Sequence, residues 1–211
     1  LDFIICSNVV NEYVTPQLSC IIQGGIGATC PCIDINCACA GFIYAVEIAE
    51  SFYQAGKVRN VLVVSAEEPT RMTDWNDRRT CVLFGDGAGA AVLAPGDNIK
   101  CVKLSASSAT DKLWQYRLLH PTPYITKKET DVPLQMKGQD VFKFAVKAAS
   151  KDISRVLEET GHGADDVDHY LLHQANIRII NAIQEYLEQP KEKFPTNIED
   201  HGNSSSSCCP I

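Results

Sequence analysis

The chain has 211 residues, enough for one large domain or two small ones with a real core. Its 19 Lys and Arg against 26 Asp and Glu give a net charge of −7, which argues against a nucleic-acid-binding protein. The 45% hydrophobic content excludes general disorder, and no apolar run approaches the roughly 20 residues of a membrane helix. We therefore expect a soluble globular protein with no nucleic-acid or membrane partner.

The predicted elements alternate between strand and helix along the chain. In the first half the strands are Leu1–Cys6, Cys32–Asn36, Val61–Ser65, Cys81–Phe84 and Gly89–Leu93, and the helices are Gln17–Gly24 and Gly41–Gly56. In the second half a long amphipathic helix from Val141 to Leu157 is closed by Gly161, then comes a strand, Tyr170–Leu172, and a helix from Ile179 to Leu187. Prolines in residues 105–135 predict a long loop or covering flap between the halves. This order predicts an α/β sandwich with helices covering sheets.

The two ends of the sequence resemble the interior of a fold. The chain opens without Met in an apolar strand pattern, and it stops at Cys208–Ile211 as a new apolar element begins. Because a natural domain usually ends in a polar tail, we expect the chain to be incomplete at both ends. If the true start of the chain is missing, the lack of a targeting signal says nothing about the compartment in which the protein works.

Ten cysteines are many for this length. Several lie inside apolar runs such as Phe3–Cys6, where a free thiol behaves as a small hydrophobic group. Secreted disulfide scaffolds are small and loop-rich, so we expect mostly reduced, buried thiols in a cytoplasm-like compartment.

Cys39 lies where a predicted strand gives way to a helix. Unpaired N–H groups and the helix dipole at such a junction lower the pKa of a thiol. The small residues Ala40 and Gly41 leave room for a substrate to approach. Cys39 is therefore a candidate nucleophile, and the alternative is a buried thiol beside a packing glycine.

Four closely spaced cysteines also suggest a metal-binding domain with no enzymatic activity. Thiolate metal sites use pairs such as Cys30 with Cys32 and Cys37 with Cys39. Residues 33–36 contain no Gly or Pro to fold one pair onto the other, which disfavours this alternative.

Two polar motifs in the second half supply further candidates. His173 directly follows a predicted strand, which places its imidazole on a strand-to-helix turn, a common place for site residues. Asn203 lies on a glycine turn before four serines, where the alternative is an ordinary exposed loop with an Asx turn. A lone His is more often structural, and we expect His120, His162 and His169 on the surface or in loops.

The glycine-rich stretch Gly85–Gly89 does not predict a nucleotide site. It leads into another strand, so no helix N-terminus is available for a pyrophosphate. We expect a tight hairpin in which backbones pack closely.

Four ordered motifs together carry a resemblance to a known family. They are Ala38–Phe42, the stretch Asp77–Ala91, His173–Ile180 and Gly202–Ser204. In this order they resemble β-ketoacyl-acyl-carrier-protein synthase III, the initiating condensing enzyme of fatty-acid synthesis, over essentially the whole chain. The resemblance implies the thiolase-like fold, a layered α-β-α-β-α sandwich that works as a homodimer. It further implies a partial N-terminal half at residues 1–100 and a partial C-terminal half at residues 101–211.

The resemblance also implies a mechanism. Cys39 takes an acyl group from an acyl-CoA, and malonyl-acyl-carrier protein then loses carbon dioxide and attacks the acyl-Cys39 carbonyl. His173 and Asn203 are the two donors that stabilise the enolate oxygen. Coenzyme A enters as a substrate thioester, so no separate cofactor and no metal is implied, and the compartment is a bacterial cytoplasm or a plastid. Plant-type polyketide synthases, which also use Cys, His and Asn, are the alternative among condensing enzymes.

Further site residues come from the resemblance alone. Those implied to bind CoA or to line the acyl pocket are Arg78, Phe84, Leu134, Gln139 and Asn176, and those implied to dock the carrier protein are Lys143 and Arg178. Gln139 stands where the family commonly has Asn, and Glu185 and Tyr186 occupy positions that are often basic. Val14 replaces an aromatic residue that usually closes the acyl pocket across the dimer, which leaves the chain length of the starter open.

Overall fold

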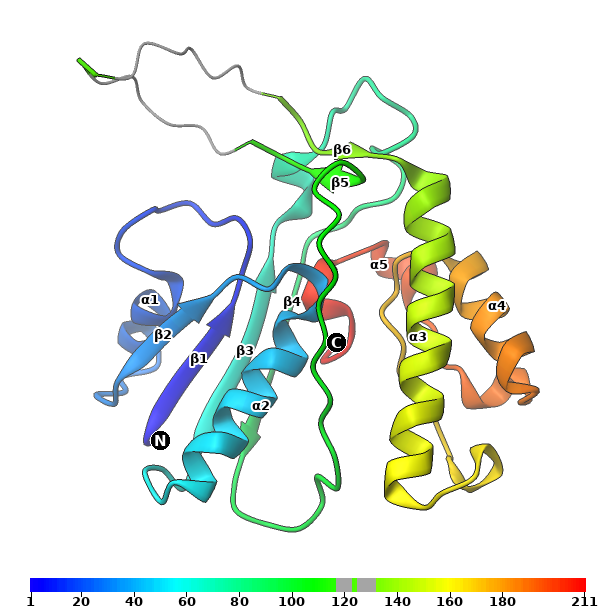
Figure 1. Ribbon diagram of the computed structural model, residues 1–211. Coiled ribbons are helices and arrows are strands. Elements are labelled where there is room, and N and C mark those ends of the chain that lie inside the picture. Colours follow the sequence, from blue (N-terminus) through cyan, green and yellow to red (C-terminus); the bar gives the residue numbers. More distant parts are fainter. Residues whose placement is uncertain (117–122, 125–131) are drawn as a thin grey trace.

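The computed structural model describes residues 1–116, 123–124 and 132–211 (Figure 1). The first part of the chain forms a four-stranded sheet in the order β2-β1-β3-β4. The strands are β1 (Phe3–Ser7), β2 (Cys32–Ile35), β3 (Val61–Glu67) and β4 (Gly87–Leu93). β1 pairs in parallel with β2 and β3, and β4 runs antiparallel to β3. β1 is thus central, and its residues Ile4, Ile5 and Cys6 are fully buried, as expected for a parallel strand between two neighbours.

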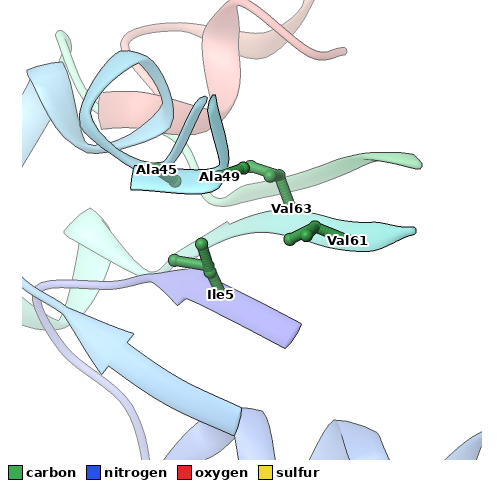
Figure 2. Packing of buried hydrophobic residues seen from close by; sticks show 5 residues of the cluster. All are labelled: Ile5, Ala45, Ala49, Val61 and Val63. Atoms are coloured by element: carbon green, nitrogen blue, oxygen red, sulfur yellow. The ribbon is translucent and has the colours of Figure 1, made fainter. Parts of the chain in front are cut away.

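The main core lies between this sheet and α2 (Gly41–Gln54). Figure 2 shows Ala45 and Ala49 of α2 facing Ile5, Val61 and Val63 of the sheet, and all five side chains are fully buried. Because alanines at positions i and i+4 lie on one helix face, they let α2 approach the strands closely. A second helix in this part, α1 (Leu18–Gly25), packs against β1 and β2.

The second part of the chain is mainly helical. It contains α3 (Gly138–Thr160) and α4 (Ile177–Leu187), which pack side by side (Figure 1), and the short pair β5 (Leu113–Trp114) and β6 (Gln135–Met136). A second core cluster gathers around α4 and contains Tyr170, Ile179, Ile180, Ile183 and Phe194. The rings of Tyr170 and Phe194 stack with their centroids 4.8 Å apart. Gly161 ends α3 in the left-handed conformation, with a φ of 70°, as the sequence predicted.

Two predicted strands are wrong. Residues 81–83 form turns, because the N–H groups of Thr80 and Leu83 bond locally to the carbonyls of Asp77 and Thr80. The tight hairpin expected at Gly85–Gly89 is therefore wrong as well, because β4 has no strand directly before it and pairs with β3 instead. Residues 170–172 form no ladder either, since the backbone bond of this segment is a single one from the Tyr170 N–H to the Lys193 carbonyl, 2.7 Å long. Tyr170 and Leu172 pack in the cluster around α4 instead of in a sheet, and Leu171 is exposed.

The loop predicted over residues 105–135 is described in part. Residues 117–122 and 125–131 lie outside the described residues, as does His120. The described portion contains β5 and β6 and is tied back by a bond from the Leu134 N–H to the Met72 carbonyl, 2.9 Å long. Among the helices that the structure describes, none has the length and apolar character needed to cross a membrane.

Candidate active site

Cys39 lies in a single 3-10 turn, η1 (Ala38–Ala40), between the end of β2 and the first residue of α2. The predicted strand-to-helix junction is therefore confirmed. Ala38 takes a positive φ of 46°, an uncommon conformation for a residue with a side chain. Its N–H bonds to Asn36 Oδ1 at 3.3 Å. Cys39 as a whole residue is partly exposed, although its thiol is buried.

Gly41 fixes how closely this turn approaches the sheet. A Cβ at position 41 would lie 1.7 Å from Ser7 Oγ, at the end of the central strand β1. Ser7 is fully buried, and its hydroxyl lies 3.1 Å from Ser206 Oγ. Only glycine allows this approach, so the start of α2 and the nucleophile candidate beside it are held against the sheet.

A buried serine turn near the end of the chain closes the site from the other side. The turn is η5 (Ser205–Cys208), and it packs against both η1 and β3. Ser206 donates a 2.6 Å hydrogen bond to the carboxylate of Glu67, which also accepts from the Val9 N–H at 3.0 Å. Burial raises the pKa of Glu67, while the serine and backbone hydrogen bonds oppose the rise. These bonds attach η5 to the sheet directly behind Cys39.

The structure places Cys39 and His173 close enough for the charge of each to shift the pKa of the other. Burial raises the pKa of the Cys39 thiol, but the charge and hydrogen bond of His173, with a hydrogen bond from Ser205, outweigh burial and lower it overall. Ser205 Oγ donates to Cys39 Sγ over 3.9 Å. Burial lowers the pKa of His173, but Cys39 and Cys208 outweigh it and raise this pKa to about 10. Both shifts favour a thiolate beside an imidazolium, and the thiolate is the reactive form of a cysteine.

Cys208 is a site residue that the sequence did not single out. Its Sγ lies 2.9 Å from His173 Nδ1 and accepts the Gln174 N–H at 3.3 Å. The residue is 4% exposed, and the neighbouring Cys209 Sγ is 3.9 Å away. The unusual Cys208–Cys209 pair after the serines is the sequence feature that could have drawn attention to it.

Asn203 is buried directly before this turn. Its N–H bonds to the Leu83 carbonyl at 2.7 Å, and its own carbonyl accepts the Gly85 N–H at 3.2 Å. Its Oδ1 accepts the Ser205 N–H at 3.0 Å, which orients the amide. Among the described residues, none accepts a hydrogen bond from its Nδ2. The Asx turn considered from the sequence is present, but the exposed loop is wrong because residues 203–207 are buried.

The other predicted site residues lie in different settings. Phe84 is partly buried and pairs its backbone with Asn203, and Leu134 is partly buried beside Met72. Asn176 caps α4, because its Oδ1 accepts the Arg178 N–H at 2.9 Å. The sequence analysis missed this capping role, although an Asn directly before an apolar helical run signals it. The exposed residues are Arg78, Gln139, Lys143 and Arg178.

The four thiols proposed as metal ligands do not converge. Cys32 Sγ lies 3.4 Å from Cys20 Sγ, whereas Cys39 contacts His173 and Ser205. Within the described residues, no group of three or more His, Cys, Asp or Glu side chains could hold a metal ion. All ten cysteines are free thiols in the structure.

Comparison with known proteins decides the family. A sequence model described as 3-oxoacyl-[acyl-carrier-protein] synthase III matches residues 33–111, and the model of its C-terminal part matches residues 157–211. All of the chain aligns at 39% identity with 67% of the β-ketoacyl-[acyl-carrier-protein] synthase III of Clostridium novyi. The chain belongs to the β-ketoacyl-acyl-carrier-protein synthase III family. The resemblance seen in the sequence is thereby confirmed.

Solved structures agree with this assignment. The β-ketoacyl-[acyl carrier protein] synthase III of Thermus thermophilus matches all of this chain with a TM-score of 0.89 at 32% identity, and 66% of that chain is covered. The enzyme of Aquifex aeolicus matches with a TM-score of 0.81 at 37% identity, again over 66% of its length. These matches confirm the predicted α/β, thiolase-like fold class. The chain spans about two thirds of the length of the synthase III proteins it matches.

Proposed function

We propose that this chain carries the acyl-transfer and condensing centre of a synthase III that initiates fatty-acid synthesis. The observation that carries the proposal is that the turn η5 binds Cys39 through Ser205 and His173 through Cys208, which places the imidazole where its charge lowers the pKa of a thiol at the start of a helix. Family membership supports the same chemistry. In this proposal residues 1–100 supply the nucleophile, and residues 101–211 supply the imidazole and the amide.

The first step is transfer of an acyl group to Cys39. The thiolate attacks the thioester carbonyl of an acyl-CoA, a bond forms between Cys39 Sγ and the acyl carbon, and the bond to the CoA sulfur breaks. The CoA thiolate leaves with the proton that the His173 imidazolium gives up. His173 is then neutral, which suits it to the second step.

The second step is decarboxylative condensation. Malonyl-acyl-carrier protein loses carbon dioxide, and negative charge develops on its thioester oxygen. The His173 N–H and the unpartnered Nδ2 of Asn203 are the donors for this oxygen, and one preorganised donor of this kind contributes about 3 kcal/mol. The resulting carbanion attacks the acyl-Cys39 carbonyl, the carbon–sulfur bond breaks, and Cys39 leaves as the thiolate. The product is a 3-oxoacyl-carrier protein.

The surrounding residues complete the proposal. Arg78, Gln139 and Asn176 would contact CoA, and Phe84 and Leu134 would line the acyl pocket. Lys143 of α3 and Arg178 of α4 are exposed on neighbouring helices, which supports a docking role for an acidic carrier protein, where charge mainly raises the association rate. We also propose a homodimer that works in a bacterial cytoplasm or a plastid, with no metal or separate cofactor.

Mass spectrometry of the intact protein tests the first step. After incubation with a panel of acyl-CoAs, we expect one acyl group per chain on the peptide that contains Cys39. Cys39→Ala should take up none, and Cys37→Ala, which removes a partly buried thiol two residues away, should acylate normally. Acylation of Cys37 or of any other thiol would contradict the assignment.

The division of roles needs a second assay. His173→Ala should still acylate Cys39, more slowly, but should fail to condense the acyl group with malonyl-acyl-carrier protein. Asn203→Ala should acylate at nearly the parent rate and lose condensation about a hundred- to a thousand-fold, as expected for the removal of one oxyanion donor. A variant that loads no acyl group yet still decarboxylates the malonyl thioester would overturn this division.

A further inference from the structure

A second buried thiol, that of Cys208, contacts a ring nitrogen of His173. Cys208 Sγ lies 2.9 Å from Nδ1. With Nδ1 engaged in this way, Nε2 is the ring nitrogen left to serve Cys39 and the substrate. The sulfur also accepts the Gln174 N–H at 3.3 Å, so it is held from the segment that carries His173 as well as from η5.

A neutral thiol can form a hydrogen bond with Nδ1 whether the imidazole is charged or neutral. Its sulfur accepts a hydrogen bond, and its S–H donates one. Its hydrogen bond with Cys209 and its burial both raise the pKa of Cys208, so the proton stays on this sulfur at neutral pH. When His173 is an imidazolium, Nδ1–H donates to the sulfur. When His173 is neutral, the S–H of Cys208 donates to Nδ1, and the ring proton is kept on Nε2.

We propose that Cys208 is a positioning residue that keeps an N–H of His173 directed at the reacting atoms in both steps of the cycle. The role in the cycle rests on the proposed function, whereas the contact itself does not. In the first state Cys208 stabilises the imidazolium beside the Cys39 thiolate. In the second state it selects the neutral tautomer that donates from Nε2 to the enolate oxygen.

The neighbouring groups cannot replace this thiol. The Gln174 N–H is a donor only, and so it cannot accept from Nδ1–H. The charged and titratable groups around the pair are Cys39, Cys208, Cys209 and, behind the serine turn, Glu67. Cys209 Sγ is 3.9 Å from Cys208 Sγ and makes no hydrogen bond with the imidazole, which makes it a matched control.

The rate of Cys39 alkylation by iodoacetamide as a function of pH tests the first state. Peptide mapping separates Cys39 from the other thiols. In Cys208→Ala the imidazolium loses its acceptor, and we expect Cys39 alkylation at pH 7 to fall about three- to ten-fold, the loss expected for the net contribution of one ordinary hydrogen bond, since a thiol is a weak acceptor. The profile should also move to higher pH. Cys208→Ser keeps a group that donates and accepts, so it should recover most of the rate, and Cys209→Ser should match the parent.

Two results would overturn the proposal. One is a Cys208→Ala profile that superimposes on that of the parent. The other is a Cys208→Ser profile shifted as far as that of Cys208→Ala, which would show that the sulfur acts through its volume and not through hydrogen bonds. Thermal unfolding of each variant establishes that it is folded before its alkylation rate is interpreted.

A nitrogen-15 NMR measurement tests the second state without any change at Cys208. In Cys39→Ala the thiolate partner is gone, and we expect neutral His173 to carry its proton on Nε2, with Nδ1 accepting from Cys208. A proton on Nδ1 instead would contradict the proposal. If the NMR and alkylation results hold but the protein never condenses acyl-CoA with malonyl-acyl-carrier protein, then the proposed function fails and the role of Cys208 toward His173 stands.

Discussion

The sheet region that carries Cys39 and the helical region that carries His173 are held together by different means. In the sheet region, β1 has a hydrogen-bonded neighbour on each side, and the main core residues are fully buried. The cluster around α4 is held by side-chain packing, and its members retain exposures of 2% to 8%. The candidate nucleophile therefore lies on the more completely buried support, and η5, which contacts Cys39 through Ser205 and His173 through Cys208, joins the two regions.

Matched truncations in the two cores should show the largest difference. Ile5→Ala leaves a cavity that the flanking strands cannot close, and we expect a loss of about 4 kcal/mol in the free energy of unfolding. For Ile180→Ala we expect about 2.5 kcal/mol, because α4 can shift toward the space left behind. Urea unfolding of both variants measures the two losses. An equal or larger loss for Ile180→Ala would show that the helical region is the less adaptable one.

A single methyl group at Gly41 should break the contact between the helix and the sheet. Gly41→Ala places a Cβ against Ser7 Oγ, and we expect overpacking to cost about 2–3 kcal/mol and to slow Cys39 alkylation. Gly24→Ala in α1 is the control, because no atom lies within 4 Å of the added Cβ. That change should be neutral or stabilise the protein by up to about 1 kcal/mol. Equal stability of the two variants would contradict the close approach.

The pair that bridges the two regions should give a characteristic pH dependence. The lowered pKa of Cys39 adds stability that is complete above the ordinary thiol value of 9.0 and is lost as the pH falls through the folded value. The pKa of His173, raised to about 10, adds stability that is complete below the ordinary value of 6.5 and is lost as the pH rises toward 10. Above the pH at which folded Cys39 is a thiolate and an ordinary histidine is neutral, and up to about pH 9, the two slopes cancel, because the folded and unfolded states bind the same number of protons.

The measurement is the difference in unfolding free energy between the parent and Cys39→Ala across this pH range. Taking the difference removes contributions from other groups such as Glu67. We expect a plateau that ends near pH 9 and a decline from there toward pH 10, where folded His173 loses its proton. A difference that changes steadily through neutral pH would mean that the thiolate–imidazolium pair does not form.

The smallest expected effect lies at the start of α4. Asn176→Ala removes the side-chain cap, and we expect the free energy of unfolding to fall by about 1 kcal/mol in thermal or urea unfolding. Asn176→Asp keeps a side chain that can cap the helix, so it should retain most of the parent's stability. Lys137 precedes α3 and caps nothing, and its ion pair with Asp111 is exposed, so Lys137→Ala should change stability by about 0.5 kcal/mol or less. Equal losses at the two helix starts would argue against the cap.

Much of the fold could be predicted because its elements follow local patterns. The β-branched run at Val61 predicted β3, and Gly161 predicted the end of α3. The strand at Cys81–Phe84 was wrong because apolar content cannot show that a run meets no strand partner. Tyr170–Leu172 failed for the same reason, since Tyr170 and Leu172 are covered by α4 and Phe194 and not by neighbouring strands.

The candidate site was predictable only as separate pieces. Motif order pointed to Cys39, His173 and Asn203, and the structure brings the first two into contact. Nothing local could show that Cys208 lies against Nδ1, because that contact joins residues 35 positions apart through the fold. The fit of Gly41 against Ser7 was equally hidden, since a glycine at a helix start is usually read as a small residue and not as a spacing requirement.

The serine turn also determines when the thiol can become reactive. Ser206 contacts Ser7 across 199 positions of the sequence, and Ser205 contacts Cys39 across 166. Contacts between such distant residues form late in folding, and during synthesis the chain emerges from its N-terminal side. Until η5 docks, Cys39 lacks its partners and has the weak nucleophilicity of an ordinary thiol. Under the proposed function, the thiol therefore gains its full reactivity toward acyl-CoA only after the residues that surround it have come together.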